Sequence, residues 1–237
     1  MPHTSFFSKT FLKSAFSIAL PIALQSFITS GVNLIDVVML GRLGDVDIAA
    51  VGCANQIYFL LTLVLFGVSS GASVFMAQFW GKQDLGGVHR TMGVMYALAL
   101  FVSLLFTVGA LFFPEQLISI YSQDPEVIRH GASYLRIVGA SYIVTAFSYT
   151  MGFACRATGN VRLPMITSIM SVATNTVLNF ILIFGLLGFP ALGLRGAAIA
   201  TAIARVLEFS VISLVIYRNR TPIAAGLIQL FGRFDRD

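Results

Sequence analysis

The sequence is poor in charge for its length. Asp, Glu, Lys and Arg make up 11% of its 237 residues, whereas 57% are hydrophobic. This composition supplies too little polar surface to coat a soluble globule, so soluble classes of protein are excluded. The apolar residues form long, uninterrupted runs and not short alternating segments, which favours membrane-spanning helices over a membrane barrel.

Cysteine and histidine are scarce as well. Cys53 and Cys155 lie among small apolar neighbours, and their spacing suits neither a disulfide framework nor a metal site. His3, His89 and His130 fall at the ends of the apolar runs or in the connectors between them. Inside the runs there is no nucleophile with a base, no pair of carboxylates and no metal-spaced histidine, so we expect no enzyme.

What the sequence has instead is six apolar runs of the length that crosses a hydrocarbon core of roughly 30 Å. They predict an all-α integral membrane protein, a six-transmembrane-helix bundle with both termini on one side. The fourth run follows Asp124-Pro125-Glu126, a helix-start signal, and a short apolar stretch in 114–126 that we expect along the membrane surface. The spans lie near residues 14–38, 48–78, 91–113, 127–151, 163–187 and 194–217.

Lysine and arginine gather on one side of this predicted topology. Because basic residues concentrate in cytoplasmic loops, the bias predicts a cell-membrane protein with both termini in the cytoplasm. It also accounts for the net charge of +5, so we expect no nucleic-acid partner. The exceptions on the opposite side are Arg42, Arg129 and Arg195. Ten of the fifteen basic residues lie on the predicted cytoplasmic side, at Lys9, Lys13, Lys82, Arg90, Arg156, Arg162, Arg218, Arg220, Arg233 and Arg236.

Small residues recur at helical spacing in two of the runs. Gly67 and Gly71 form a GxxxG pair in the second run, and Gly196, Ala200 and Ala204 continue the pattern in the sixth. Small side chains allow the backbones of two membrane helices to approach closely. We therefore expect close helix packing at both places.

One acidic residue, Asp36, stands inside an otherwise apolar run. A carboxylate at membrane depth costs at least a few kcal/mol, so it normally faces a partner or a water-filled cavity and is a candidate functional group. No basic residue lies within one turn of it in sequence, so its compensation must come from another helix or a ligand. Burial favours its protonated form and a nearby cation its charged form. Asp36 can therefore exchange a proton for a metal ion or a cationic substrate, which is the minimal chemistry of an antiporter.

Asn175 and Asn179 are the next candidates, because a spacing of four residues puts both amides on one face of the fifth span. With Asp36 and a hydroxyl such as Thr201 they offer the hard oxygen ligands that alkali cations prefer, and the same set could hold a proton. The structural alternative is that these Asn and Thr side chains only join neighbouring helices.

The remaining intramembrane charges have structural interpretations. Arg205 and Glu208 are three residues apart and would neutralise each other on one helix face. Arg136 would extend to the interface or pair with an acid. The other polar residues of the runs are Asn33, Asn55, Gln56, Tyr134 and Thr174.

Several of these residues lie in short motifs that follow one another in a familiar order. The motifs are ALPIAL around Pro21, Asp36 followed by VVMLGRLG, AQFWGKQD at 77–84, YLRI at 134–137, RATGN at 156–160, and the stretch from Asn175 to Thr201. Their ordered sum, over nearly the whole chain, resembles the multidrug and toxic compound extrusion transporters.

The resemblance implies a cation-coupled exporter of bulky, mostly cationic organic compounds, built from two six-helix lobes. It implies that Asp36 couples transport to H⁺ or Na⁺, that the first helix bends at Pro21, and that Asn175 and Thr201 are ligands of the coupling ion. No other cofactor is expected. Part of the family has a second acid where this chain has Asn179, and a single carboxylate favours a monovalent ion or one proton. Tyr134 matches a cavity-lining tyrosine, and Asn33 and Gln56 are further cavity candidates.

Under this resemblance the chain corresponds to one lobe of a twelve-helix transporter. Residues 1–217 would form the amino-terminal lobe and residues 218–237 a cytoplasmic linker towards a carboxy-terminal lobe. We expect a fragment or truncated product, or else a natural half that dimerises; the expected partners are a second six-helix lobe, membrane lipid and organic cations. The alternatives are a flippase for a lipid-linked precursor, from the same superfamily, and a membrane scaffold that transports nothing.

Overall fold

In this computed structural model the described part of the chain is residues 9–226, without the side chains of residues 9–15, 17, 18, 21, 22, 29, 32, 33 and 36. Over these residues the chain forms helices and connecting turns, with no strand. The helices are α1 (Lys9–Gly41), α2 (Asp45–Gly81), α3 (Leu85–Phe112), α4 (Pro114–Ser119), α5 (Pro125–Gly139), α6 (Tyr142–Ala157), α7 (Arg162–Phe184) and α8 (Leu194–Arg218).

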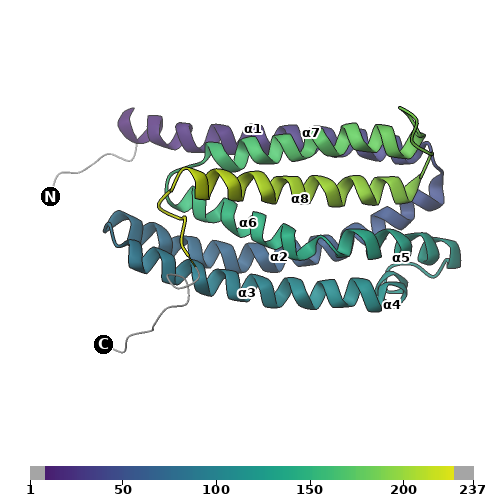
Figure 1. Ribbon diagram of the computed structural model, residues 1–237, viewed down its shortest axis with the longest axis horizontal. Coiled ribbons are helices and arrows are strands. Elements are labelled where there is room, and N and C mark those ends of the chain that lie inside the picture. Colours follow the sequence, from purple (N-terminus) through teal and green to yellow (C-terminus); the bar gives the residue numbers. More distant parts are fainter. Residues whose placement is uncertain (1–8, 227–237) are drawn as a thin grey trace.

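The long helices run side by side along the long axis of the molecule (Figure 1). α1 begins and α8 ends at the same end of the bundle, on the left of Figure 1, which we call the terminal end. The opposite, distal end holds the α1–α2 turn, α4, the start of α5 and the α7–α8 connector. This alternation is the arrangement that an even number of crossings predicts.

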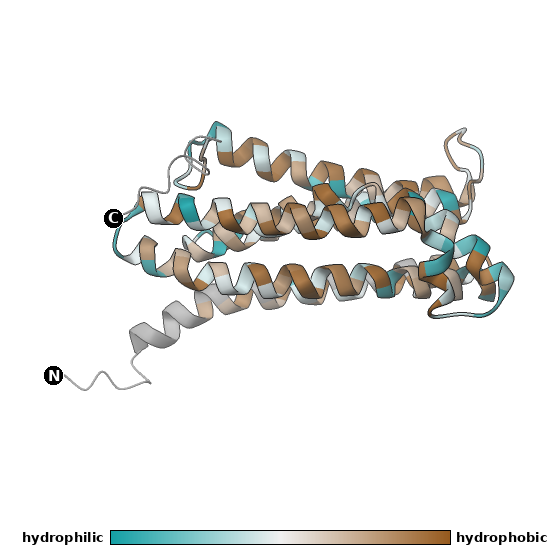
Figure 2. Cartoon of the chain, turned by 90° about the horizontal axis from the view of Figure 1, so that it is seen from below, coloured by the Kyte–Doolittle hydropathy of each residue, from teal (hydrophilic) through white to brown (hydrophobic). Residues whose placement is uncertain are grey.

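The composition of the helices is that of a membrane bundle. Among the described helices, α2, α3, α7 and α8 are each long and apolar enough to cross a membrane, and α5 with α6 makes one further crossing if the bent pair is a single broken span. α1 is 33 residues long and occupies the first predicted span. Figure 2 shows apolar residues along the helices and polar ones mainly at the two ends. The predicted all-α membrane bundle is confirmed.

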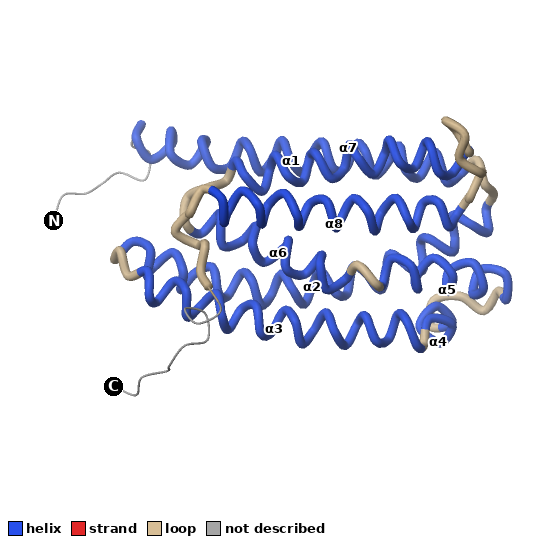
Figure 3. The backbone as a smooth tube through the Cα atoms, viewed as in Figure 1, coloured by secondary structure: helices blue, strands red, loops and turns tan. Residues whose placement is uncertain are grey.

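The fourth predicted span, 127–151, is not a continuous helix. α5 ends at Gly139, α6 begins at Tyr142, and their axes differ by 55° (Figure 3). At the break both the backbone N–H and the hydroxyl of Ser141 donate to the carbonyl of Val138, over 2.9 and 2.7 Å. A Cβ at Gly139 would collide with Ala110 of α3. The break therefore lies beside a point where α5 packs closely against α3.

The connector before α5 is more ordered than a simple loop. The helix start predicted at Asp124 is confirmed, since the Asp124 carboxylate accepts the backbone N–H of Glu126 over 2.8 Å. The short apolar stretch ahead of it forms the six-residue helix α4, with Ile118 fully buried. That α4 lies along a membrane surface stays a prediction.

The core consists of two clusters arranged along the bundle. One, towards the distal end, includes Leu135 and Ile183; the other, towards the terminal end, includes Met76 and Ile212. α8 contributes to both, with Ala198 in the first cluster and Ile212 in the second. The stretch of α8 between these residues holds the charged residues Arg205 and Glu208.

The segment after α8 folds back onto the bundle. Ile223 and Ala225 are buried, and His89 of α3 donates its Nε2–H to the carbonyl of Pro222 over 2.7 Å. The Tyr217 hydroxyl donates to the carbonyl of Ala225 over 3.2 Å. The predicted linker thus starts with a packed segment, and residues 227–237 lie outside the described part.

Close packing of glycine occurs at one of the two predicted places. A Cβ at Gly196 would lie 2.6 Å from the Leu182 carbonyl oxygen, so α7 and α8 touch backbone to backbone there. A Cβ at Gly67 or Gly71 would meet no described atom within 4 Å. The predicted close approach is therefore confirmed for α8 and is wrong for α2 within the described residues.

Gly196→Ala should force α7 and α8 apart. Leu182 contributes backbone atoms that cannot rotate away, so we expect the free energy of unfolding to fall by about 1–3 kcal/mol. Unfolding of the purified chain in mixed micelles measures this change. The matched control is Gly67→Ala, which adds the same methyl group to an open helix face and should change stability little. Equal losses in both variants would contradict the packing argument.

Candidate functional site

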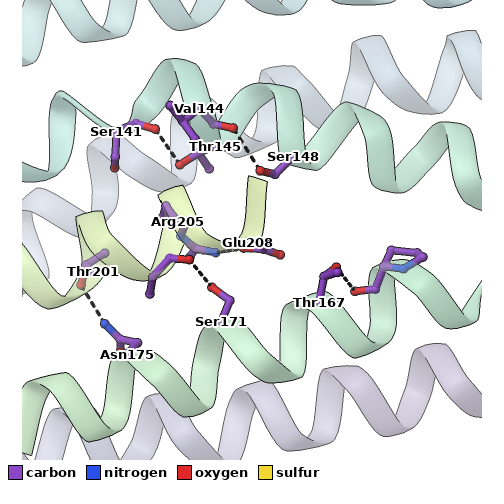
Figure 4. Close-up of polar contacts among 12 residues, drawn as sticks. Ser141, Val144, Thr145, Ser148, Thr167, Ser171, Asn175, Thr201, Arg205 and Glu208 are labelled. Atoms are coloured by element: carbon purple, nitrogen blue, oxygen red, sulfur yellow. Dashed lines mark hydrogen bonds and ion pairs between the residues drawn. The ribbon is translucent and has the colours of Figure 1, made fainter. Parts of the chain in front are cut away.

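Three of the predicted site residues form one hydrogen-bonded network on α7 and α8. Figure 4 shows its bond between Asn175 and Thr201. The Asn179 amide nitrogen donates to Asn175 Oδ1 over 3.3 Å, and Asn175 Nδ2 donates to Thr201 Oγ1 over 3.2 Å. One turn along α7, the buried Ser171 hydroxyl donates to the Ala204 carbonyl of α8 over 3.0 Å. The structure thus brings together Asn175, Asn179 and Thr201, as the spacing and the resemblance predicted.

The direction of these bonds follows from the chemistry of the hydroxyl. Thr201 has one O–H, which donates to the carbonyl of Ala197 over 3.0 Å. Thr201 Oγ1 can therefore act only as an acceptor towards Asn175, which must turn its NH₂ to Thr201 and its Oδ1 to Asn179. The network runs one way, from the Asn179 amide to the backbone of α8.

The first-helix candidates fall on α1, which packs along α7. Pro21, Asn33 and Asp36 lie within the bounds of α1, but their side chains lie outside the described residues. Their roles as helix bend, cavity residue and coupling acid stay predictions.

A charged pair lies further along α8. Arg205 Nη1 is 3.2 Å from Glu208 Oε2, which confirms that the two residues neutralise each other. The Arg205 guanidinium also lies 5.5 Å from the centre of the Tyr58 ring of α2, within the range of a cation–π contact. The ring of Tyr58 lies 6.1 Å from that of Tyr142 of α6. A charged and aromatic group therefore joins α2, α6 and α8 inside the bundle.

Arg156 and Gln25 are polar residues of the bundle whose place the sequence analysis missed. Arg156 was expected in the fourth-to-fifth connector, but α6 continues to Ala157 and holds Arg156 within the helix. Its Nη2 donates to Gln25 Oε1 of α1 over 3.4 Å, and its guanidinium lies 5.5 Å from the ring centre of Phe153. Gln25 inside the first apolar run was the available signal. Together they join α1 to α6.

The cavity candidates lie in different surroundings. Tyr134 of α5 is 7% exposed and belongs to the distal core cluster. Gln56 of α2 is exposed. Arg136 pairs with Glu115, their charged atoms 3.8 Å apart, which confirms the expected acid partner. That Tyr134 and Gln56 contact a transported compound stays a prediction.

Comparison with known proteins identifies similar sequences. The MatE family model matches residues 21–181. A Bacillus anthracis protein named probable multidrug resistance protein NorM is 30% identical over 227 residues, covering 95% of this chain and 49% of that protein. The uncharacterized transporter YisQ of Bacillus subtilis (strain 168) is 28% identical over 223 residues, covering 94% of this chain and 48% of that protein. The chain spans about half the length of these curated relatives.

Solved structures share the fold. An outward-facing multidrug resistance MATE family transporter of the MOP superfamily matches with a TM-score of 0.84 at 21% identity, covering 94% of this chain and 49% of that chain. A MOP superfamily transporter from Pyrococcus furiosus, described by the reverse polarity of its binding pocket, matches with a TM-score of 0.83 at 21% identity. The match covers 94% of this chain and 48% of that chain. The bundle therefore has the fold of about half of each, as predicted for one lobe of a two-lobe transporter.

Breaking the Arg205–Glu208 pair should destabilise the bundle. Glu208→Gln leaves a guanidinium that is only 30% exposed without its charged partner. We expect the free energy of unfolding to fall by about 1–3 kcal/mol, with part of the loss recovered in Arg205→Gln/Glu208→Gln. A double-mutant cycle measures the coupling between the two side chains.

The pair of Arg136 and Glu115 is the matched control for this cycle. Both side chains are more than half exposed and their charged atoms are 3.8 Å apart. Water screens such a pair, so its coupling should stay below about 1 kcal/mol. Coupling as large as that of the Arg205 pair would show that burial does not decide the difference.

Proposed function

Because the chain belongs to the MatE family, we propose that it forms the amino-terminal six-helix lobe of a cation-coupled antiporter that exports lipophilic, mostly cationic organic compounds. The family is one of multi-pass membrane transporters, and the chain spans about half the length of its curated relatives. The proposed activity therefore requires a second six-helix lobe. The observation that carries the proposal is the amide–hydroxyl network between α7 and α8, beside α1.

In the proposed mechanism Asp36 carries the coupling charge. It stands five residues before the end of α1 at Gly41, and Asn179 stands five residues before the end of α7 at Phe184. Both helices end at the distal end, and α1 packs along α7 (Figure 1). Asp36 and Asn179 therefore lie at about the same distance from the distal end, which supports a shared ion or proton site between Asp36 and the network.

The network suits a small charge. Thr201 and the two asparagines are neutral, so Asp36 would be the one carboxylate of the site. Amide and hydroxyl oxygens are hard ligands suited to Na⁺, and the same groups can hydrogen-bond a protonated carboxyl. We propose that one Na⁺ or one proton, and not a divalent cation, drives the exchange.

The transported compound would be held mainly by apolar and aromatic surface. The chain has 21 Phe and 8 Met, residues whose rings and thioethers adapt to varied lipophilic cations. Tyr134, Asn33 and Gln56 would add polar contacts.

The ion would act through the shape of α1. Entering from outside, it would neutralise Asp36, shift α1 at Pro21 and narrow the cavity, so that the compound leaves. Such folds alternate access by moving one half against the other around a central site, which is the reason the second lobe is needed. Both termini would be cytoplasmic.

Asp36→Asn should abolish gradient-driven export, because an amide cannot exchange a proton for a cation. The measurement is efflux of ethidium or norfloxacin, across pH and Na⁺ gradients, from cells producing this chain together with a carboxy-terminal lobe. Asp45→Asn, an exposed change in the first turn of α2, is the control and should leave efflux intact. If Asp36→Asn exports as well as the parent chain, the coupling role is wrong. If the chain alone also exports, the need for a second lobe is wrong.

Thr201→Val should weaken the dependence of export on the coupling ion. The substitution keeps the shape of the side chain and removes one oxygen, so we expect about a fivefold higher ion concentration for half-maximal efflux, the equivalent of about 1 kcal/mol. Thr176→Val is matched, since Thr176 of α7 makes the same kind of bond, to the carbonyl of Val172 over 3.1 Å, outside the network. Equal effects of the two substitutions would point to helix stability and not to ion binding.

A further inference from the structure

The distal end of the bundle has two adjoining hollows that the proposed transport does not use. Their volumes are about 420 and 460 Å³. Arg129 and Ser133 of α5 and Arg195 of α8 line both of them. Arg136 and Glu115 complete the first hollow, and Asp47 and His130 contribute to the second.

The guanidiniums of these hollows are incompletely paired. Glu115 Oε1 lies 3.8 Å from Arg136, at the limit of an ion pair, and Asp47 Oδ1 is taken by His130 Nδ1 at 2.6 Å. Arg195 Nε donates to the neutral Ser133 hydroxyl over 3.3 Å. Arg129 has neither a hydrogen bond nor an ion pair to any residue in 9–226. Three arginines therefore share a small space with too few carboxylates to balance them.

The position of Arg195 adds to the positive potential. It lies in the first turn of α8, whose N-cap residue, Gly193, offers no side-chain bond and whose first turn contains no acid. A helix N-terminus carries a partial positive charge, so a cation there is unfavourable and an anion is favourable. An anion in the hollows would be attracted both by the helix end and by the three exposed guanidiniums.

We propose that these hollows bind the oxyanion of a phosphate ester. All three cations are arginines, whose planar forks match phosphate oxygens, and no lysine lines either hollow. Large apolar side chains at the same end are exposed, including Phe113 at the start of α4 and Phe189 in the α7–α8 connector. The ester is either the headgroup of a membrane phospholipid or a free solute, and both present the same group to the arginines.

The proposal also accounts for an exception in the charge pattern. Arg129 and Arg195 are two of the three basic residues that break the bias towards the predicted cytoplasmic side. The structure brings these two together in one site, and Arg42 lines neither hollow. A binding role explains why they occur on the side where basic residues are otherwise rare.

The test is a thermal titration of the purified 237-residue chain in neutral detergent at constant ionic strength. The ligands are glycerol 3-phosphate and the short-chain lipid dihexanoyl phosphatidylglycerol. We expect at least one of them to raise the melting temperature, and Arg129→Gln/Arg195→Gln to weaken its apparent affinity by about tenfold or more. Arg42→Gln, an exposed arginine of the same end, is the matched control and should bind like the parent chain.

The outcomes distinguish a lipid headgroup from a free phosphate ester as the ligand, and they also show whether the proposal fails. Stabilisation by both ligands identifies a site for the free ester, and stabilisation by the lipid alone identifies a headgroup site. If neither ligand stabilises the chain, or Arg42→Gln loses as much affinity as the double variant, the proposal is overturned. Should the glutamine variant fail to fold, Arg129→Lys/Arg195→Lys replaces it, because lysine keeps the positive charge but lacks the planar guanidinium. An unchanged affinity of the lysine variant for the ligand would equally overturn recognition by arginine.

Discussion

The structure depends on one constraint, which is that polar groups inside a membrane must be bonded by the protein itself, since no water is present there to bond them. Long helices satisfy their own backbones. Many of the hydroxyls inside them bond backward to carbonyls of the same helix, as Thr150 does to Ala146 over 2.9 Å. Where the helix is interrupted between α5 and α6, the hydroxyl of Ser141 is bonded in the same way, to the carbonyl of Val138. On α7 the Asn179 amide donates to Asn175 of the same helix, and the Asn175 amide donates across the interface to Thr201 of α8, which gives the candidate site.

This constraint also separates what could be predicted from what could not. Hydropathy located the spans to within about six residues, because the length of an apolar run can be read directly from the sequence. It could not find the break after Gly139, which lies beside the close contact with Ala110 of another helix. It misplaced Arg156 for the same reason. A basic residue near the end of an apolar run is typical of a loop, and its partner Gln25 lies on another helix, far away in the sequence.

The candidate site divides along the same line. The spacing of Asn175 and Asn179 placed their amides on one face, and the resemblance supplied Thr201. The order of the bonds came only from the structure, because it depends on the Thr201 hydroxyl donating to Ala197. The Arg205–Glu208 pair was foreseen from a spacing of three, whereas its contact with Tyr58 joins residues far apart in sequence. Local spacing is predictable from sequence, and the partner across a helix interface is not.

The folded-back segment after α8 has a mechanical consequence. Ile223 and Ala225 are buried against the bundle, and Pro222 is fastened to His89 at the start of α3. The segment is therefore held from two sides, by the α2–α3 hairpin through His89 and by α8 itself through the Tyr217 hydroxyl, which donates to the carbonyl of Ala225. A shift of α8 relative to the α2–α3 hairpin would have to break one of these two attachments, so the segment couples the positions of the two elements at the terminal end of the bundle.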